Sequence, residues 1–412
     1  MPAFNTLDDI DVSGKKILLR VDINSPLERE TLEIKDDVKI ASALPTVREL
    51  AEKNARVAIL AHQGRKDQWD FRDLSPHADI LSDLLGREVR YIDDLIGEKA
   101  KSAIRSLADG EMILLANLRT LDEESAKLSS DAHADSQLVR TLSPLFDLFV
   151  NDAFASSHRR HASCVGFPMV LPSAAGRLME REIGTLEKIT ESPERPCVFV
   201  FGGYKFADAI PVIQNLMLRD IADRILLGGL IGLAFLASEG HDIGPENVRS
   251  LRDELTEENM GAARDIIADY GESVVLPVDM ALDADGERER WDVESGPAEF
   301  PSLDIGDRTI ELFGKLLSEA KTVLISGPVG VFEREQFAKG TYSVFDKSVS
   351  SGAFSIIGGG HTTAAAKQMG FAEKISYSST GGGALERYLT GKPLPAVEAL
   401  IVSALRHKFI EP

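Results

Sequence analysis

Arginine, histidine and acidic side chains gather in the first half of the chain, each group directly after a short apolar run. The residues concerned are Arg20, Asp22, Asn24, His62, Arg65, Asn117, Arg119, Asn151, Asp152 and the run His158-Arg159-Arg160-His161. A guanidinium group pairs bidentately with a carboxylate or a phosphate. We therefore expect Arg and His side chains from four strand ends to form a pocket for a small polyanion, with Arg160 left in a solvated turn.

The second half of the chain carries glycine at the corresponding places. Its clusters are Gly202-Gly203-Tyr204-Lys205, Gly228-Gly229, Ser326-Gly327-Pro328-Val329-Gly330, Gly358-Gly359-Gly360-His361 and Thr380-Gly381-Gly382-Gly383. One glycine pair after a strand is usually only a tight turn. Five clusters in one half instead favour a phosphate site, because such turns and the helix N-termini behind them offer backbone N–H groups to phosphate oxygens. We predict a nucleotide site there, with Lys205 as a functional residue.

The apolar runs predict the strands that position these residues. They are Ile17–Asp22, Val57–Ala61, Met112–Leu115 and Leu145–Val150 in the first half, and Cys197–Phe201, Arg224–Leu227, Val274–Val278, Val323–Ile325 and Phe354–Ile357 in the second. Runs that are apolar on both faces and alternate with helical patterns indicate parallel strands covered by helices. Ligands of such sheets bind at the carboxyl ends of the strands. The predicted fold is α/β, with two Rossmann-like lobes, each a parallel sheet covered by helices, and an interlobe cleft.

The length of 412 residues suits two domains of ordinary size. We place an N-terminal lobe for the acid substrate at residues 1–172, joined by the C-terminal tail 395–412, and a nucleotide-binding lobe at residues 173–394. The boundary rests on the Pro, Ser and Gly residues between 168 and 176. Residues 283–301 are polar, contain Gly and Pro, and are predicted to form a long surface excursion.

The charge and the cysteine content exclude several kinds of partner and location. Asp and Glu outnumber Lys and Arg by 66 to 46, and the formal charge of −20 repels nucleic acid and anionic lipid. Neither nucleic acid nor a membrane is expected as a partner, since no apolar run approaches the ~18 residues of a membrane span. Cys164 and Cys197 are too few for a disulfide framework, and residues 1–10 lack a signal-peptide pattern. We expect a cytoplasmic monomer.

Several common nucleotide-binding signatures are missing. The chain contains no G-x-x-x-x-G-K-[ST] and no G-x-G-x-x-G, which excludes an ordinary phosphate-loop NTPase and removes the best evidence for a dinucleotide dehydrogenase. The motif set of the protein kinases is absent as well. A nucleotide site in this chain must therefore be built in another way.

The motifs that are present resemble, in their order, those of phosphoglycerate kinase. The matching segments are Arg20-Val21-Asp22-Ile23-Asn24, Ala61-His62-Gln63-Gly64-Arg65, Asn117-Leu118-Arg119, Val150-Asn151-Asp152-Ala153-Phe154 with His158-Arg159, Gly202-Gly203-Tyr204-Lys205, Gly327-Pro328-Val329-Gly330-Val331-Phe332-Glu333, Phe337-Ala338-Lys339-Gly340-Thr341, Gly358-Gly359-Gly360-His361 and Ser379-Thr380-Gly381-Gly382-Gly383-Ala384. They run from about residue 15 to 400, and the histidine at 361 resembles the archaeal branch of the family.

The resemblance implies a reversible phosphoryl transfer between 1,3-bisphosphoglycerate and ADP that gives 3-phosphoglycerate and ATP. Lys205 and Lys39 would be catalytic, and Mg²⁺ would be held by the phosphates of ADP or ATP and by water, with no metal-binding side chain expected. The residues implied for the acid are Asp22, Asn24, Lys39, His62, Arg65, Arg119 and Arg159. Those implied for the nucleotide are Gly202, Gly203, Tyr204, Lys205, Pro328, Glu333, Gly358, Gly359, Gly360, His361, Thr362, Gly381, Gly382 and Gly383.

The chain departs from the family pattern at some of these positions. The family normally has arginine at the position of Lys39, alanine at Tyr204 and asparagine at Ser326. Bacterial and eukaryotic members carry a second lysine where Ala209 stands and an aspartate where His361 stands. These departures leave two alternatives open, a divergent paralogue that acts on another small acid and a non-catalytic metabolite-binding protein.

Overall fold

The chain divides into two units within helix α7 (Arg177–Glu191). The computed structural model describes residues 3–407. Unit 1 contains the described residues up to Thr185 together with those from Pro393 onward, and unit 2 spans Leu186–Lys392. The division predicted from the sequence lies thirteen residues earlier, after residue 172, whereas the contacts within each unit place it after Thr185.

The beginning of α7 is held by unit 1, which explains this later division. The backbone N–H groups of Leu178 and Met179 donate to Oδ1 of Asp152 at 2.9 and 3.0 Å. Arg177 pairs with Asp8 at 2.6 Å and with Glu49 at 2.7 Å. A stretch rich in Pro, Ser and Gly marks a break in the pattern of elements, but it does not show which contacts the following helix makes.

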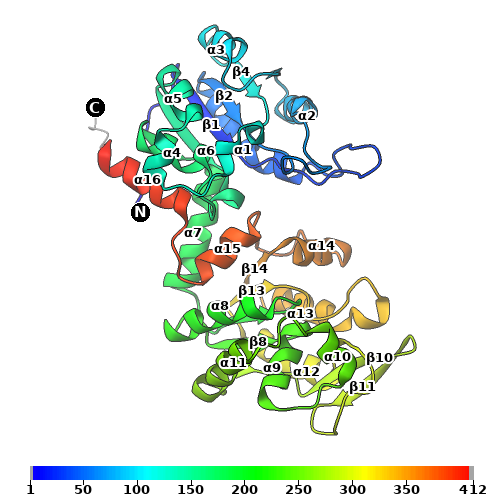
Figure 1. Cartoon of the computed structure of the whole chain (residues 1–412). Coiled ribbons are helices and arrows are strands. Elements are labelled where there is room, and N and C mark those ends of the chain that lie inside the picture. Colours follow the sequence, from blue (N-terminus) through cyan, green and yellow to red (C-terminus); the bar gives the residue numbers. More distant parts are fainter. Residues whose placement is uncertain (1–2, 408–412) are drawn as a thin grey trace. The chain divides into compact units, whose positions relative to one another are not determined.

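Unit 1 is built on a six-stranded parallel sheet in the order β3-β4-β2-β1-β5-β6. Strands β1, β2 and β4 of this sheet are labelled in Figure 1. The strands are β1 (Lys16–Val21), β2 (Arg56–Leu60), β3 (Val89–Ile92), β4 (Met112–Leu115), β5 (Leu148–Asp152) and β6 (Ser173–Ala175). The helices are α1 (Val38–Glu52), α2 (Ser75–Leu85), α3 (Glu98–Arg105), α4 (Ser130–Ala134), α5 (Gln137–Leu142), α6 (Ala162–Val165) and α16 (Pro395–Arg406). Short 3₁₀ helices include η1 (Leu118–Thr120), η2 (Asp122–Ser125), η3 (Ser143–Leu145), η4 (Phe154–Ser156) and η5 (Phe167–Met169).

The two faces of this sheet are buried in two separate cores. Ile17 and Leu19 of β1 belong to a core that includes apolar residues of α1 and α2. Leu18 belongs to a second core with apolar residues of α3 and α5. Successive side chains of a strand point to opposite faces, so a run that is apolar throughout is what a strand covered on both sides requires.

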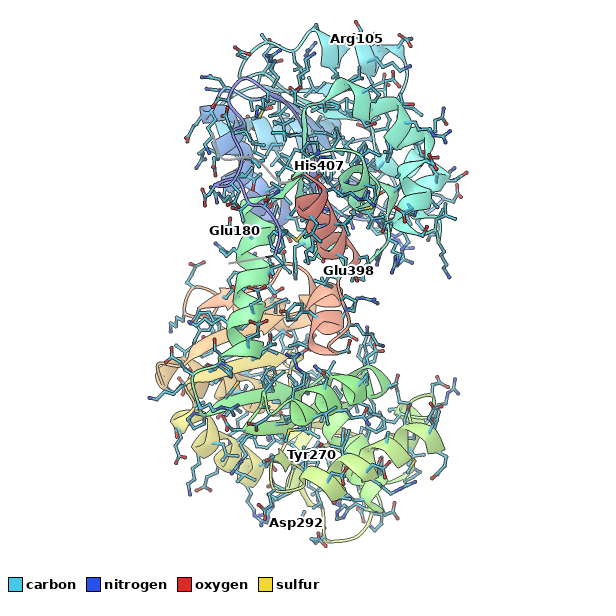
Figure 2. All side chains as sticks on the ribbon, turned by 90° about the vertical axis from the view of Figure 1, so that its left-hand side faces the viewer. Arg105, Glu180, Tyr270, Asp292, Glu398 and His407 are labelled. Atoms are coloured by element: carbon cyan, nitrogen blue, oxygen red, sulfur yellow. The ribbon has the colours of Figure 1, made fainter. Side chains whose placement is uncertain are left out.

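Helix α16, which carries Glu398 (Figure 2), returns the end of the described chain to unit 1. The Ser403 hydroxyl donates to the carbonyl of Leu171 at 3.0 Å, and the backbone N–H of Ala396 donates to the carbonyl of Ser157 at 3.2 Å. Ala396 also packs with Cys164 in a small apolar cluster. The helix is therefore a structural part of unit 1, although its sequence follows that of unit 2.

Unit 2 contains a second six-stranded parallel sheet, in the order β15-β14-β13-β7-β8-β9. Strands β8, β13 and β14 of this sheet are labelled in Figure 1. Its strands are β7 (Cys197–Phe201), β8 (Arg224–Leu227), β9 (Val274–Val275), β13 (Thr322–Ser326), β14 (Phe354–Gly358) and β15 (Tyr377–Ser378). Its helices are α8 (Phe206–Leu218), α9 (Gly229–Glu239), α10 (Pro245–Ser250), α11 (Glu257–Tyr270), α12 (Asp307–Glu319), α13 (Lys339–Ser350), α14 (Gly360–Gln368) and α15 (Gly382–Leu389), with the 3₁₀ helix η6 (Glu335–Phe337). The predicted α/β class with two helix-covered parallel sheets is thus confirmed.

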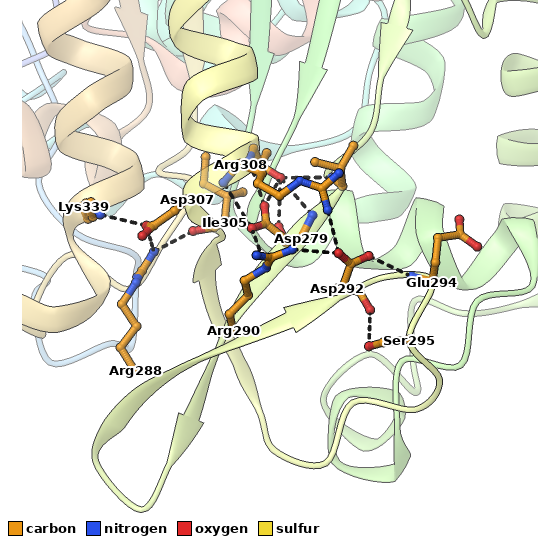
Figure 3. A network of polar contacts seen from close by, with 12 residues as sticks. Asp279, Arg288, Arg290, Asp292, Glu294, Ser295, Ile305, Asp307, Arg308 and Lys339 are labelled. Carbon is orange, nitrogen blue, oxygen red and sulfur yellow. Dashed lines mark hydrogen bonds and ion pairs between the residues drawn. The ribbon is translucent and has the colours of Figure 1, made fainter.

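The predicted surface excursion at residues 283–301 contains strand as well as loop: residues 283–284 and 287–292 are strand, and residues 293–301 form the loop. A three-stranded antiparallel sheet is formed by β10 (Asp279–Ala284), β11 (Glu287–Asp292) and β12 (Ser302–Ile305) in the order β11-β10-β12. The arginines of the edge strand β11 pair with buried acids of β10 and β12. Arg288 lies 2.8 Å from Asp304, and Arg290 lies 3.5 Å from Asp279 within the network drawn in Figure 3.

The strand registers bring the predicted site residues to one edge of each parallel sheet. In unit 1, Arg20 is paired with both Leu60 and Asn151, so the loops after β1, β2 and β5 leave the sheet at the same level. In unit 2, Ser326 is paired with both Phe201 and Gly358. Each set of loops therefore has the position at which open parallel sheets bind ligands.

Cys164 in unit 1 and Cys197 in unit 2 are free and buried, and burial raises the pKa of their thiols to about 11 and about 12. Among residues 3–407, no helix is both long and apolar enough to cross a membrane.

Candidate functional site

A cavity of about 440 Å³ opens at the carboxyl edge of the unit 1 sheet, and we call it cavity A. Its walls are Asp22, Asn24, Lys39, His62, Gly64, Arg65, Gln68, Trp69, Asp70, Arg119, Ala155, Ser156 and Arg159. All seven residues that the sequence analysis assigns to the acid line this one cavity. They come from the loops after β1, β2, β4 and β5 and from the first turn of α1.

The floor of cavity A contains an ionised carboxylate. Asp22 accepts a hydrogen bond of 2.7 Å from the Ser156 hydroxyl, and its Oδ1 lies 3.6 Å from Nζ of Lys39. Burial works against its charge, but Lys39, Arg20 and the hydrogen bond from Ser156 hold the pKa of Asp22 well below the usual range. Asp22 therefore orients Lys39 toward the cavity instead of acting as a proton donor near neutral pH.

Arg119 is fixed at the wall of cavity A by the loop that carries it. The side-chain oxygen of Asn117 accepts from the backbone N–H of Arg119 at 3.1 Å and so caps η1. The Asn117 amide also donates to the carbonyls of Gln63 and Arg72, at 2.8 and 2.7 Å. The guanidinium of Arg119 donates to the carbonyl of Gly64. Burial and the neighbouring charges of Arg159 and Arg20 lower the pKa of Arg119, as expected for a cluster of like charges.

The charge of cavity A has the opposite sign to that of the whole chain. Four permanent cations, Lys39, Arg65, Arg119 and Arg159, face the two carboxylates Asp22 and Asp70. Arg65 and Arg159 are exposed and contribute their guanidinium groups to the rim. Such an arrangement attracts a small polyanion to an otherwise acidic protein.

Arg20 is not part of the cavity wall, although the sequence analysis places it with the polyanion pocket. Leu18 packs into the core formed with α3 and α5, and Arg20, two residues further along β1, points to the same face. Its side chain is fully buried, donates from Nε to the Ser163 hydroxyl at 2.9 Å and lies 3.1 Å from Nδ1 of His62. Arg20 thus supports cavity A from behind.

A second cavity, of about 380 Å³, lies at the carboxyl edge of the unit 2 parallel sheet, and we call it cavity B. Its walls include Gly202, Gly203, Tyr204, Lys205, Asp208, Ala209, Val212, Ile231, Ser326, Gly327, Pro328, Gly358, Gly359, Gly360, His361, Thr362, Gly382, Gly383, Leu385, Glu386 and Leu389. Glycines and hydroxyl groups form one side, and apolar side chains of α8 and α15 form the other. This combination suits a ligand with phosphate groups and an apolar ring.

Two glycines of cavity B are required by the close approach of their loops. A Cβ atom on Gly202 would lie 2.2 Å from the carbonyl oxygen of Pro328. Gly327 has a φ of +91°, and a Cβ there would lie 2.3 Å from the carbonyl oxygen of Gly202. The Gly203 N–H donates to the Pro328 carbonyl at 2.8 Å, and Thr362 Oγ1 accepts from the Gly327 N–H at 2.8 Å. The loops after β7 and β13 and the N-terminus of α14 therefore form one rigid cradle.

Lys205 precedes α8 and carries the only permanent cation in the wall of cavity B, as far as the described residues define that wall. Its Nζ lies 3.3 Å from Oδ2 of Asp208, and 56% of its side chain is exposed. The hydrogen bond with Asp208 raises the pKa of Lys205. The ammonium group therefore stays charged and can swing on its stem toward a bound phosphoryl group.

The structure does not bring every predicted nucleotide residue to cavity B. Gly381 is the N-cap residue of α15, one position before the wall residue Gly382. Glu333 is exposed and lines a different hollow, together with Tyr342 and Met369. The remaining twelve of the predicted residues do line cavity B.

Several wall residues were not predicted from the sequence. Gln68, Trp69 and Asp70 line cavity A, and Asp208 and Glu386 line cavity B. Trp69 carried the clearest signal, because tryptophan is rare in this chain and follows Arg65 in the same loop. The acidic wall residues Asp70, Asp208 and Glu386 could not be recognised in the sequence, because Asp and Glu are common throughout it.

Comparisons with known proteins agree with this geometry. The family model described as phosphoglycerate kinase matches residues 7–392. The phosphoglycerate kinase of Methanopyrus kandleri is 46% identical over 397 residues, which cover 96% of this chain and 97% of that protein. That of Methanothermus fervidus is 43% identical with the same coverage of 96% and 97%. The crystal structure of phosphoglycerate kinase from Pyrococcus horikoshii OT3 has a TM-score of 0.89 and 37% identity, and the match covers 98% of this chain and 100% of that chain.

Proposed function

The chain belongs to the phosphoglycerate kinase family and is an enzyme of that activity, and from this premise we propose how its two cavities divide the reaction. Cavity A binds 3-phosphoglycerate or 1,3-bisphosphoglycerate, and cavity B binds ATP or ADP. The phosphoryl group passes between them without a covalent enzyme intermediate. The observation that carries the proposal is the gathering of all seven predicted acid ligands in one cationic cavity of an acidic chain.

The acid assignment rests on charge and on the shape of guanidinium groups. The substrate 3-phosphoglycerate carries a carboxylate and a phosphate, and each can pair bidentately with an arginine. Arg65, Arg119 and Arg159 supply such groups at the wall of cavity A. Asn24 accepts from the Gly64 N–H at 3.0 Å, which ties the loops after β1 and β2 together under the bound acid.

The nucleotide assignment rests on the backbone of cavity B. Gly359 begins the turn before α14, and Gly381 begins the turn before α15. A helix N-terminus offers unpaired N–H groups and a favourable dipole to phosphate oxygens. The apolar residues Val212, Ile231 and Leu389 supply the surface for a base. Contact between Glu333 and the ribose, implied by the family resemblance, remains a prediction.

The transfer itself requires alignment and neutralisation of charge. In the direction of ATP use, a carboxylate oxygen of 3-phosphoglycerate attacks the γ-phosphorus, the bond from that phosphorus to the β-phosphate oxygen breaks, and ADP leaves. The transition state spreads negative charge over the equatorial oxygens. We assign Lys205 to that charge and Lys39 to the acid that attacks, so both act by electrostatic stabilisation.

Mg²⁺ enters this scheme as part of the nucleotide substrate. Within residues 3–407 no group of three or more His, Cys, Asp and Glu side chains is arranged to hold a metal ion. Mg²⁺ prefers oxygen ligands and commonly keeps several waters when it binds nucleotide phosphates. We propose that the phosphates and water hold it in cavity B. A cytoplasmic location and a monomeric state remain predictions.

Adjacent arginines provide the test of the acid assignment. Arg159 lines cavity A, whereas its neighbour Arg160 is exposed and lies outside the wall. Calorimetry with 3-phosphoglycerate alone should show binding that Arg159→Ala weakens by roughly 2 to 4 kcal/mol, because the substitution leaves an anionic group of the ligand without its cationic partner. Arg160→Ala should bind like the parent.

A coupled assay with 3-phosphoglycerate and MgATP completes this test. We expect turnover in the parent and in Arg160→Ala and a strong decrease of kcat/KM in Arg159→Ala. Equal binding by both variants would overturn the assignment of cavity A. Binding of 3-phosphoglycerate without turnover would favour a non-catalytic metabolite-binding protein, and turnover only with another acid would favour the divergent paralogue.

A further inference from the structure

Arg20 is a fully buried arginine that has no assigned role in the reaction. Its Nε donates to the Ser163 hydroxyl at 2.9 Å, one terminal nitrogen donates to the carbonyl of Val21, and the other lies 3.1 Å from Nδ1 of His62. Ser163 in turn donates to the buried carboxyl of Glu124 at 2.7 Å. The three bonds of the guanidinium group hold its plane in one orientation.

The contact between Arg20 and His62 determines where the imidazole proton lies. A guanidinium group has five N–H donors and no acceptor. At 3.1 Å the Nδ1 atom of His62 must therefore accept the hydrogen bond with its lone pair. A neutral imidazole whose Nδ1 accepts carries its proton on Nε2.

The surroundings of His62 exclude the alternative in which both ring nitrogens are protonated. Burial lowers its pKa well below the ordinary value; Asp22 opposes this effect, while Arg20, Arg119 and His161 add to it. The ring of His161 lies 6.5 Å from that of His62. An imidazolium ion would also place an N–H group of His62 against the N–H groups of Arg20. His62 is thus neutral, and its single proton has one position.

The Nε2 atom of His62 is directed away from Arg20. His62 lines cavity A, and among residues 3–407 its Nε2 makes no hydrogen bond. We propose that Arg20 is a positioning residue that fixes His62 as the Nε2–H tautomer and so makes it a hydrogen-bond donor to an oxygen of the bound acid. The identity of that acid rests on the proposed function; the tautomer does not.

The effect of Arg20 goes beyond orientation. A cation bonded to Nδ1 draws electron density from the ring, and hydrogen bonds in a chain polarise one another. The Nε2–H group then binds an anionic oxygen more strongly than the same group in an isolated imidazole. A neutral donor also adds no positive charge to a cavity that already holds four permanent cations.

The first experiment measures the tautomer directly in the ligand-free protein. Two-bond ¹⁵N–¹H correlation spectra of protein labelled at its eight histidines distinguish a protonated from an unprotonated ring nitrogen. The spectrum of His62→Gln identifies the His62 signals by their absence. We expect a protonated Nε2 and an unprotonated Nδ1 between about pH 5.5 and 8, a range that spans the ordinary histidine pKa of about 6.5. An Nδ1–H tautomer or an imidazolium ion would overturn the proposal.

Arg20→Met tests whether Arg20 is the cause. Without a donor at Nδ1, both tautomers or the charged form should appear in the His62 signals. Arg20→Lys keeps the positive charge but lacks the planar guanidinium group. The fraction of His62 in the Nε2–H form should then lie between those of the parent and of Arg20→Met. An unchanged Nε2–H signal in a folded Arg20→Met protein would show that Arg20 does not position the ring.

A pair of variants at His62 tests the consequence without touching the buried arginine. The amide nitrogen of glutamine can take the place of Nε2, whereas that of asparagine lies nearer to the place of Nδ1. We expect His62→Gln to bind 3-phosphoglycerate within about threefold of the parent, and His62→Asn to bind it roughly 10- to 100-fold more weakly, as for a hydrogen bond to a charged group. Equally weakened binding in the two variants would contradict donation from Nε2. If the parent fails to bind 3-phosphoglycerate, the proposed function fails and the spectra still decide the tautomer.

Discussion

Lys39 occupies the first turn of α1 and faces the carboxylate of Asp22 across 3.6 Å, with 33% of its side chain exposed. The family resemblance places an arginine there, whose planar fork could pair with Asp22 and with the bound acid at once. Lysine offers one compact and strongly hydrated charge. Lysine at this position therefore keeps the positive charge of arginine but aligns the substrate less well.

We predict that Lys39→Arg raises turnover. One better transition-state contact contributes roughly 1 to 3 kcal/mol, which corresponds to about tenfold or more in rate. Steady-state kinetics with 3-phosphoglycerate and MgATP measure the change. Lys35→Arg is the matched control, because Lys35 pairs with Glu28 at 3.0 Å on an exposed surface. Equal or lower turnover in Lys39→Arg would mean that cavity A has adapted to lysine.

Lys205 should act mainly on the rate of the chemical step. Its ammonium group, held by Asp208 at 3.3 Å, would stabilise charge that develops during transfer more than charge already present in bound ATP. We expect Lys205→Ala to reduce kcat by about 10²- to 10³-fold while the Kd for ATP changes little, and Lys205→Arg to recover part of the rate. If kcat stayed within threefold of the parent and the Kd rose strongly, Lys205 would be a binding residue only.

Most of the residues assigned to cavity A could be predicted because they follow strand ends that meet at one edge, whereas Lys39, in the first turn of α1, was implied only by the family resemblance. Asn24, His62 and Arg119 are examples, and their order along the chain was enough to group them. The role of Arg20 could not be predicted, because the face of β1 to which it points depends on the packing of α3 and α5 against the sheet. Trp69 lies in a loop whose path no periodicity reveals.

At the scale of elements, the strands that were predicted are those buried on both faces, such as β1 and β7. The missed strands are not continuous apolar runs in the sequence. Strand β3 contains the exposed Arg90, and β6 consists of Ser173–Ala175 only. Strand β11 is charged, and its arginines form ion pairs with buried acids on β10 and β12. A pattern of apolar runs cannot detect a strand of this kind.

Helix α2 supports the floor of cavity A through a buried histidine. His77 is 1% exposed, and its Nε2 lies 3.0 Å from Oε1 of Gln63, the residue after His62. The same oxygen of Gln63 accepts from the backbone N–H of Ser25 at 2.9 Å. The helix, the loop after β1 and the loop after β2 are thus joined at one side chain.

The burial of His77 predicts that the stability of the protein depends on pH. Burial lowers the pKa of His77 from 6.5 to about 4, against the opposing effect of Asp73. The unfolded chain binds a proton near pH 6.5 and the folded chain only near pH 4, so the stability that neutral His77 contributes is present above pH 6.5 and disappears as the pH falls toward 4. The decrease should reach about 3 kcal/mol.

Urea denaturation of the parent and of His77→Gln at pH 8 and pH 4.5 tests this. The glutamine amide can still donate to Gln63 but does not titrate. We expect the free energy of unfolding of the parent, relative to that of the variant, to decrease between the two pH values. A difference that does not change with pH would show that His77 is protonated in the folded protein as readily as in the unfolded one.

At the scale of the whole molecule, each unit has its own parallel sheet, its own cavity and its own tryptophan. Trp69 in unit 1 is 49% exposed at the wall of cavity A, whereas Trp291 in unit 2 is 4% exposed on β11. These are the two tryptophans of the chain. Trp291→Phe therefore leaves a fluorescent reporter in unit 1, and Trp69→Phe leaves one in unit 2.

We predict that 3-phosphoglycerate stabilises the two units unequally. A ligand at a hundred times its Kd stabilises the form that binds it by about 2.7 kcal/mol. Equilibrium unfolding followed through Trp69 should shift by this amount, and unfolding followed through Trp291 should shift much less. Calorimetry must first show that Trp69→Phe still binds the acid. Equal shifts at both reporters would mean that the units unfold as one.

The return of α16 to unit 1 has a consequence for the order in which the protein is made. Chains generally fold domain by domain as they leave the ribosome, with the N-terminal domain first. Unit 2 is continuous in sequence, but unit 1 lacks the bonds of Ala396 with Ser157 and of Ser403 with Leu171 until α16 has been synthesised. The unit whose sequence begins first is therefore completed last, and a chain that ends near residue 392 would contain all of unit 2 but an incomplete unit 1.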